Sequence, residues 1–302
     1  MIRGKHFISI DDFNREELEQ ILALATKLKA ERKANKNHRV LRGKTLAMMF
    51  LQPSNRTRVS FEVGMSQLGG DTVNIRPDEV RLGEREPIAD VARVLSRYVD
   101  AIMMRVVKHE TIVEFAKYSS VPVINGLSDR FHPCQAISDI LTIQEKKGRL
   151  EGLKLCYVGD GNNVCNSLID VAKVFGIKMI VSCPKGYEPI HDGGDAFQVI
   201  TSPEQAVAGA DIVYTDVWTS MGHEDESARR LKKFKGYTVT EALFAKAAPD
   251  AIFMHCLPAH RGEEVTHEVV EHPRSVIFDQ AENRLHAQKA VLALLLESER
   301  RE

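Results

Sequence analysis

The chain has 302 residues, which is too long for one typical hydrophobic core. This length predicts two domains, each large enough to be stable without disulfides or a structural metal. Its 41 basic and 42 acidic side chains give a formal net charge of -1, which favours a small-molecule partner over nucleic acid or a membrane. The five cysteines form no Cys-x-x-Cys pair, His and Cys show no zinc spacing, and neither a signal peptide nor a long apolar run appears, so we expect a cytosolic protein without a structural metal.

Helical and strand-like patterns alternate along the first half of the chain. The first helix is predicted after a capping box formed by Asn14 and Glu17, because apolar residues then recur at helical spacing as far as Leu28. Alternation of strands and helices predicts a parallel sheet with helices on both faces. Strands are predicted over 45–51, 72–75, 101–105 and 122–125, and helices over 54–68, 87–98, 109–118 and 132–147.

A polar break at residues 146–149 precedes a second set of elements. Strands are predicted there over 153–158, 178–182, 211–215, 251–254 and 275–278. We therefore expect an α/β protein with two doubly wound parallel-sheet domains, 1–148 and 149–280, and a cleft between them. The final segment, 281–302, has strong helical propensity and a length of roughly 30 Å, so it is expected to pack back on the first domain.

Residues 54–58, Ser-Asn-Arg-Thr-Arg, lie where a predicted strand gives way to a predicted helix. Pro53 ends the strand, and Ser54 is a candidate N-cap. The unpaired N–H groups of a first helical turn and the helix dipole attract anions, and the guanidiniums of Arg56 and Arg58 match phosphate oxygens. These features predict a phosphate site. The alternative is an ordinary helix cap followed by two solvated arginines.

Polar clusters follow the other predicted strands as well. In open α/β sheets, ligands bind beyond the carboxyl ends of the strands. The regular placement of these clusters therefore predicts one site in a cleft between the two domains. The clusters are Arg105, 132–135, 159–163, 216–222 and 255–258.

The segment Gly159-Asp160-Gly161-Asn162-Asn163 follows a predicted strand and opens a predicted helix, as a dinucleotide-binding loop does. Val164 occupies the position of the third glycine, which argues against a pyrophosphate packed on this helix. A nucleotide-binding oxidoreductase is therefore disfavoured but stays an alternative. The Asn163 amide is instead placed to hold a carboxylate at the helix start.

The other clusters each allow a functional and a structural interpretation. His132 and Gln135 lie three residues apart at a helix start and could polarise a carbonyl oxygen, although a lone histidine is more often structural. The loop 216–222 is either a lid whose acid recognises an amino group or a plain loop that buries the single tryptophan. Cys256 could be a core thiol, and Arg284 by itself looks like a surface arginine.

Taken together, and in this order over essentially the whole chain, these clusters resemble the aspartate/ornithine carbamoyltransferase family. The resemblance implies a carbamoyl-phosphate site that includes the neighbouring pair Cys256 and Leu257. It implies that His132 and Gln135 hold the carbamoyl group. The residues implied to hold phosphate or carbonyl oxygens are Ser54, Asn55, Arg56, Thr57, Arg105 and Arg284.

The second-substrate residues resemble the ornithine branch of that family: Asp216 with Ser220-Met221-Gly222, and the segment His255-Cys256-Leu257-Pro258. The resemblance implies transfer of a carbamoyl group to the δ-amine of L-ornithine, giving L-citrulline and phosphate without a covalent intermediate, cofactor or metal. The residues implied to bind the amino-acid end of ornithine are Asn163, Asp216, Ser220 and Met221. The residues implied to be catalytic are Arg56, Arg105, His132, Cys256 and Asp216.

Members of this family are commonly trimers in which a loop from one subunit completes its neighbour's site. The likeness therefore implies a homotrimer, with Arg81 where relatives place Gln or His, and a role in arginine biosynthesis. Asn55 and Val91 each stand where Thr is usual. Because the position of Asn55 varies in relatives that use acylated ornithines, an acylated ornithine or putrescine stays an alternative second substrate. A non-catalytic anion-binding relative stays an alternative function.

Overall fold

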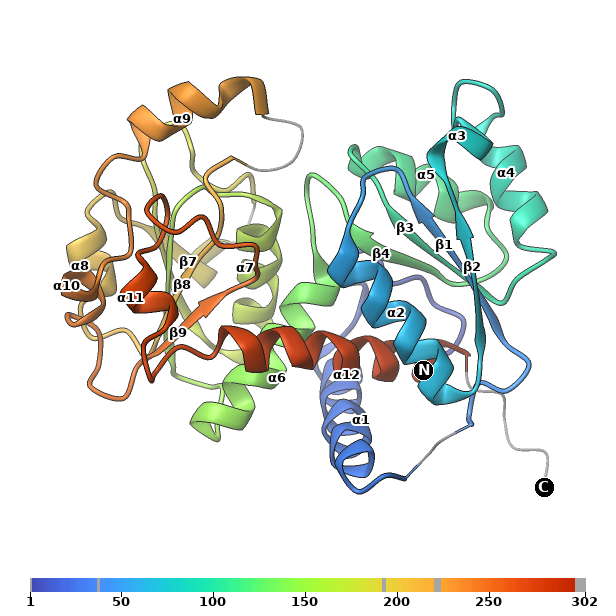
Figure 1. The fold of residues 1–302 in the computed structure, drawn as a ribbon, viewed down its shortest axis with the longest axis horizontal. Coiled ribbons are helices and arrows are strands. Elements are labelled where there is room, and N and C mark those ends of the chain that lie inside the picture. Colours follow the sequence, from blue (N-terminus) through green and yellow to red (C-terminus); the bar gives the residue numbers. More distant parts are fainter. Residues whose placement is uncertain (1, 37–38, 192–193, 220–223, 297–302) are drawn as a thin grey trace. The chain divides into compact units, whose positions relative to one another are not determined.

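Two all-parallel β-sheets form the framework of the protein, described here from a computed structural model that places residues 2–36, 39–191, 194–219 and 224–296 (Figure 1). Contacts along the chain divide it into two compact units, one formed by Met1–Ile137 with Arg284–Glu302 and the other by Ser138–Asn283. Both divisions fall inside helices, α6 (Pro133–Lys147) and α12 (Ile277–Leu296). The domain limits 1–148 and 149–280 remain a prediction.

The first unit contains a four-stranded sheet in the order β2-β1-β3-β4, all parallel as predicted. Ala47 and Met49 of β1 share one buried cluster with Ile112 of α5 and Val91 of α4. Met48 points to the opposite face and is also buried, which is typical of a parallel sheet covered on both faces. The strands are β1 (Thr45–Phe50), β2 (Asp71–Ile75), β3 (Ala101–Arg105) and β4 (Val123–Leu127), and the helices are η1 (Ile10–Asp12), α1 (Arg15–Lys33), α2 (Asn55–Leu68), α3 (Pro77–Val80), α4 (Ile88–Leu95) and α5 (His109–Tyr118).

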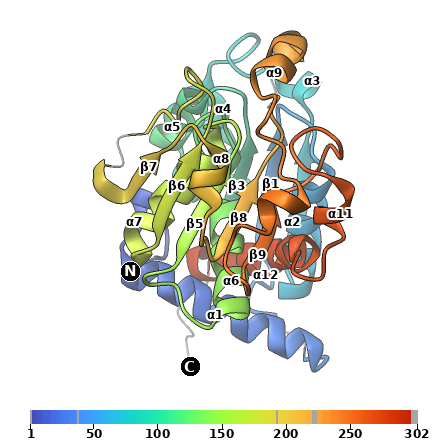
Figure 2. The ribbon, with the colours of Figure 1, turned by 90° about the vertical axis from the view of Figure 1, so that its left-hand side faces the viewer.

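The second unit contains a five-stranded parallel sheet in the order β7-β6-β5-β8-β9 (Figure 2). Cys156 of β5 and Val213 of β8 belong to a cluster that packs on α8, α10 and α11. Tyr157 and Tyr214, one position further along the same strands, point to the opposite face and stack with ring centroids 5.7 Å apart. The strands are β5 (Lys154–Val158), β6 (Lys178–Ser182), β7 (Phe197–Val199), β8 (Ile212–Thr215) and β9 (Ile252–His255), and the further helices are α7 (Asn163–Phe175), η2 (Gly194–Ala196), α8 (Pro203–Val207), η3 (Glu224–Glu226), α9 (Ser227–Lys233), α10 (Glu241–Phe244) and α11 (His267–Val270).

Two predicted elements differ from the structure, and one observed strand was not predicted. The strand expected over 275–278 is absent, because Ser275 forms only an isolated bridge to Phe253 and α12 already begins at Ile277. The last helix therefore starts before residue 281. β7 was not predicted, because it has three residues and lies at the sheet edge, where its side chains are largely exposed and show no strand pattern.

Helix α12 returns the end of the chain to the first unit, as predicted. Lys289 donates a hydrogen bond to Gln67 of α2 at 2.9 Å. Gly64 of the same helix lies so close that a Cβ there would come within 3.3 Å of Lys289 Cγ. The two helices therefore pack tightly, and residues far apart in the sequence meet. Among the described residues, no helix is both long and apolar enough to cross a membrane.

Candidate functional site

The start of α2 is a capped helix terminus, as predicted. Ser54 is the N-cap, with extended backbone, and its Oγ accepts a hydrogen bond from the Thr57 N–H at 3.4 Å. Asn55 and Arg56 are exposed at this helix start, whereas Thr57 is buried. Arg58 instead turns toward Glu62, 3.3 Å away and one turn further along. The alternative of a solvated arginine therefore describes Arg58.

Arg284 of α12 is not a surface residue but a buried member of the same cluster. Its Nη1 donates to Gln135 Oε1 at 2.7 Å, and its Nη2 lies 3.3 Å from Thr57 Oγ1. Gln288, one turn further along α12, holds the guanidinium from the other side once its amide is oriented to accept from Arg284 Nε and Nη2 at 3.3 and 3.0 Å. Its amide nitrogen then donates to Ser60 of α2 at 2.6 Å. The sequence analysis missed Gln288, although its helical spacing from Arg284 was a usable signal.

His132 is buried within the electrostatic influence of three arginines. Burial, followed by the charges of Arg284, Arg105 and Arg56, holds the pKa of His132 well below its usual value of 6.5. The imidazole is therefore neutral at physiological pH. Arg105 is 8% exposed and ends β3, so its position follows the rule that ligand groups gather at the carboxyl ends of strands. The cluster combines a neutral hydrogen-bonding ring with a strong positive field.

The shifted pKa of His132 predicts a pH dependence of stability. Below pH 6.5 the unfolded chain takes up a proton at His132 while the folded chain does not, so the free energy of unfolding falls as pH decreases toward the folded-state pKa. This contribution amounts to about 1 kcal/mol between pH 6.5 and 5.5. Urea unfolding at both pH values is expected to show a smaller loss in His132→Gln than in the wild type. Equal losses in the two proteins would contradict the prediction.

Arg81 stands apart from this cluster. It caps α3 with a left-handed backbone, φ 41°, and its side chain is exposed. Its carbonyl accepts hydrogen bonds from the N–H groups of Glu84 and Arg85, both at 2.9 Å. Within the described part of the chain, Arg81 makes no hydrogen bond or ion pair with Thr57, Gln135 or the arginines.

In the second unit, Asn162 organises a second group of predicted site residues. It is the N-cap of α7, and its Oδ1 accepts from the N–H groups of Val164 and Cys165 at 3.0 and 3.1 Å. Because Oδ1 serves the helix, the amide nitrogen faces Asp216 and donates to Oδ2 at 2.7 Å. Asn163, the predicted substrate ligand, is the first residue of α7 and is largely buried. Sequence reasoning did not identify Asn162 as the capping residue, although its type is a common signal for one.

Gly161 explains the resemblance of this loop to a nucleotide-binding motif. Its N–H donates to the Tyr187 carbonyl at 2.9 Å, and a Cβ at Gly161 would lie 2.2 Å from the backbone nitrogen of Pro189. The glycine is therefore required by the close approach of a neighbouring loop of the same unit. This finding argues against the oxidoreductase alternative, which needs that space for a pyrophosphate.

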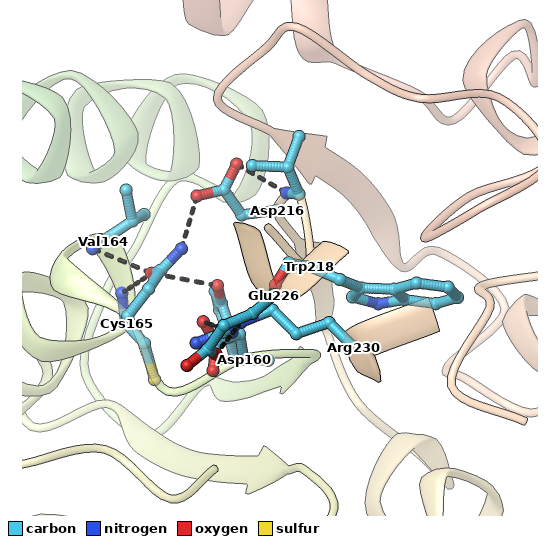
Figure 3. A network of polar contacts seen from close by, with 10 residues as sticks. Asp160, Val164, Cys165, Asp216, Trp218, Glu226 and Arg230 are labelled. Carbon is cyan, nitrogen blue, oxygen red and sulfur yellow. Dashed lines mark hydrogen bonds and ion pairs between the residues drawn. The ribbon is translucent and has the colours of Figure 1, made fainter. Parts of the chain in front are cut away.

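A buried ion pair anchors the segment that follows Asp216 (Figure 3). Arg230 donates to Asp160 Oδ2 at 2.7 Å, to the Trp218 carbonyl at 2.9 Å and to Glu226 at 3.1 Å. Trp218 itself is buried and stacks on Phe234 with ring centroids 5.5 Å apart. Trp218 is thus part of the core of this unit. The predicted ligands Ser220 and Met221 lie outside the described residues, and the lid function remains a prediction.

Cys256 completes the group around Asp216. Its thiol donates to Asp216 Oδ1 at 2.9 Å, and the same oxygen accepts from the Val217 N–H at 2.8 Å. Cys256 is partly exposed, whereas the other four cysteines are buried, so it is not a core thiol. Leu257 follows with a left-handed backbone, φ 61°. Asp216 thus lies among three donors, from an amide, a thiol and the main chain.

A metal site at this group is not favoured by its contacts. Among the described residues, potential ligand atoms of Asp216, His255 and Cys256 lie within 4.8 Å of one another. Both ring nitrogens of His255 are already engaged, Nδ1 by the Leu257 N–H at 2.8 Å and Nε2 by Glu264 at 3.0 Å. The imidazole therefore has no free lone pair to offer a cation.

Comparison with known proteins shows which family the chain resembles over nearly its whole length. Residues 5–145 match the family model described as aspartate/ornithine carbamoyltransferase, carbamoyl-P binding domain, and residues 151–295 match that of the Asp/Orn binding domain. The chain is 54% identical to the ornithine carbamoyltransferase of Thermococcus kodakarensis over 98% of this chain and 97% of the relative. It is 53% identical to that of Methanoculleus marisnigri over 97% of each chain. The solved ornithine carbamoyltransferase of Pyrococcus furiosus superimposes with a TM-score of 0.94, at 51% identity and 98% coverage of both chains.

Proposed function

Because this chain belongs to the aspartate/ornithine carbamoyltransferase family, we propose that it transfers the carbamoyl group of carbamoyl phosphate to the δ-amine of L-ornithine, forming L-citrulline and phosphate. The observation that carries this proposal is the likeness over nearly the whole chain to relatives named for the ornithine reaction. The enzyme is a transferase, and its two substrates are small molecules.

The cluster around His132 is the proposed carbamoyl-phosphate site, in the domain predicted over 1–148. The first turn of α2, from the Ser54 cap through Asn55, Arg56 and Thr57, offers N–H groups and a guanidinium to phosphate oxygens. The remaining members of the proposed site in this domain are Arg105, Arg284, His132 and Gln135. The neutral ring of His132 can donate one hydrogen bond to the carbonyl oxygen without acting as an acid, while the arginines stabilise the charge that forms there.

The group around Asp216 is the proposed site of the attacking amine, in the domain predicted over 149–280. The Asp216 carboxylate and the Cys256 thiol, joined at 2.9 Å, are placed to orient that amine, and Leu257 offers its main chain beside them. We propose that Asn163, with Ser220 and Met221, binds the amino-acid end of ornithine. An alkylamine has a pKa near 10, so the δ-amine must lose a proton before it attacks.

The reaction forms a C–N bond and breaks the C–O bond between the carbamoyl carbon and phosphate. The added nitrogen loses a proton, and phosphate leaves with the electron pair. Negative charge develops first on the carbonyl oxygen and then on phosphate, where the proposed donors Arg56, Arg105, Thr57 and His132 act. Holding the amine in contact with the carbonyl carbon also lowers the activation free energy, because the two substrates no longer have to meet in solution. Both substrates must therefore be bound at the same time.

A homotrimer is part of the proposal, together with a cytosolic location and a role in arginine biosynthesis. β2 is an edge strand, and Val73 on it is 49% exposed, as are Val59 and Val63 of α2 to similar degrees. An open edge beside exposed apolar residues suits a subunit contact. Arg81, exposed beyond the same strand, would then reach a neighbour's site. Light scattering is expected to give about three times the protomer mass of 33.9 kDa, and a monomer would contradict this.

The proposed reaction is tested by supplying carbamoyl phosphate with L-ornithine and, separately, with N-acetylornithine, N-succinylornithine, putrescine and aspartate. Ureido product and phosphate are both quantified. Turnover with L-ornithine alone is expected, because the relatives that match nearly the whole chain are named for the ornithine reaction. Turnover with an acylated ornithine or putrescine instead would show that Asn55 marks a different second substrate. Phosphate binding without any turnover would support the non-catalytic alternative.

A further inference from the structure

Glu264 is a fully buried carboxylate. Among the described residues, it makes no hydrogen bond or ion pair with the side chains that have a role in the proposed reaction. It and His255 are both 0% exposed, and His255 Nε2 lies 3.0 Å from Glu264 Oε1. The same oxygen accepts a hydrogen bond from the His260 N–H at 2.6 Å. Glu264 Oε2, by contrast, accepts no hydrogen bond from the part of the chain that the structure describes, and a buried carboxylate that is only partly bonded is costly. The pair therefore needs an explanation beyond packing.

The second nitrogen of the His255 ring shows how the ring is protonated. Nδ1 lies 2.8 Å from the backbone nitrogen of Leu257, which can only donate. Nδ1 is therefore without a proton, and the neutral ring carries its proton on Nε2, where it donates to Glu264. Glu264 thus selects the tautomer whose Nδ1 accepts from Leu257.

That bond holds a segment in an unfavourable conformation. Leu257 has φ 61°, in the left-handed region that residues with side chains rarely adopt and that persists only where surrounding contacts hold it. The bond from the Leu257 N–H to His255 closes a short turn around Cys256. Within this turn the Cys256 thiol reaches Asp216 Oδ1 at 2.9 Å. Gln280 fixes the start of the turn, because its Oε1 accepts from the His255 N–H at 3.0 Å.

We propose that His255 and Glu264 are positioning residues of the carbamoyl-transfer reaction, acting through Cys256 and Leu257 without touching either substrate. The inference rests on the proposed function. Glu264 orients the ring, the ring holds the Leu257 backbone, and this turn keeps the Cys256 thiol against Asp216, where the amine is proposed to bind. The neutral ring thus links Glu264, through Nε2, to the Leu257 backbone, through Nδ1.

Substitutions of His255 can remove its bond to Glu264 and its bond to Leu257 separately. In His255→Asn, the side-chain oxygen can still accept from the N–H two residues on, as in an Asx turn, while the link to Glu264 is lost. In His255→Gln, the amide reaches toward Glu264 but the turn loses its acceptor. The double variant His255→Asn/Glu264→Gln removes the unpaired buried charge that the single Asn variant leaves. Cooperative thermal unfolding and circular dichroism establish that each variant is folded.

The kcat with ornithine is expected to fall about 10- to 30-fold in His255→Gln, because the turn that orients the amine site relaxes. The double variant is expected to stay within about threefold of the wild type, while the KM for carbamoyl phosphate changes less than about twofold in both. Alkylation of Cys256 by iodoacetamide gives a readout independent of turnover, because the other four cysteines are buried. Its rate should rise only in His255→Gln.

A His255→Gln variant with wild-type kcat and alkylation rate would overturn the proposal. So would a folded double variant as impaired as His255→Gln, because the turn would then not be the element that matters. A wild-type enzyme without turnover on ornithine would instead overturn the proposed function, and the alkylation rates would still test the turn itself.

Discussion

Arg105→Met is expected to lower kcat/KM for carbamoyl phosphate by about 10²- to 10³-fold, the loss typical of removing one donor to a developing oxyanion. Arg105 is buried at the end of β3 and is one of three arginines that lower the pKa of His132. Its removal leaves the phosphate with one guanidinium fewer and allows the pKa of His132 to rise. The variant should therefore also lose activity at mildly acidic pH, where the wild type keeps a neutral ring.

Steady-state kinetics with varied carbamoyl phosphate and saturating ornithine, repeated at several pH values, measures both effects. Arg15→Met is the matched control, because Arg15 is half exposed, lies in the same unit and forms an ion pair with its helix neighbour Glu19 at 2.9 Å. Its kinetics should equal those of the wild type. If a folded Arg105→Met protein also kept wild-type kcat/KM, Arg105 would not be part of the phosphate site.

Asp216→Asn is expected to lower kcat/KM for ornithine by about 10²- to 10³-fold and to leave the KM for carbamoyl phosphate nearly unchanged. The carboxylate accepts bonds from Asn162, Val217 and Cys256. A hydrogen bond to a charged group contributes about 3 kcal/mol to the stability of the site. In the variant, the NH₂ group of the new amide would face the NH₂ group of Asn162, and these two facing donors cost about 1 kcal/mol more. The variant thus weakens the amine site both directly and through the main chain beside it.

Initial rates with varied ornithine measure this effect, and circular dichroism checks the fold. Asp225→Asn makes the same exchange at an exposed position of the same unit and should be neutral. An Asp216→Asn enzyme within about threefold of the wild type for ornithine would remove Asp216 from the amine site, since that change corresponds to less than about 1 kcal/mol.

The residues of the cluster around His132 were predictable one by one, but not all of their contacts. Ser54, Arg105 and His132 are unusual polar residues at predicted strand ends, and the structure confirms the helix cap at Ser54. Arg284 carried no local signal. The return of the last helix to the first unit was expected, but periodicity does not reveal that Arg284 is the residue buried there against Gln135 and Thr57.

The second group shows where local reasoning reaches its limit. Asn162 and Asn163 are the same residue type at the same helix start, and which of them caps depends on the direction in which the chain enters α7. The need for Gly161 comes from Pro189, which lies in another loop of the sequence. The segment 275–278 has the β-branched composition of a strand, yet the helical pattern that follows extends back to Ile277. Each of these local structures is therefore determined by contacts with residues outside the segment itself.

The first unit is built from two separate stretches of the chain, so its parts are synthesised at different times. Its sheet is encoded before residue 138, but Arg284 and the rest of its last helix come after the entire second unit. At about 5 to 20 residues per second, the 147 positions from 137 to 284 take roughly 7 to 30 s to synthesise. During that time the nascent first unit has the α2 terminus and His132 but neither Arg284 nor Gln288. The cluster around His132 is therefore completed last, when translation is almost finished.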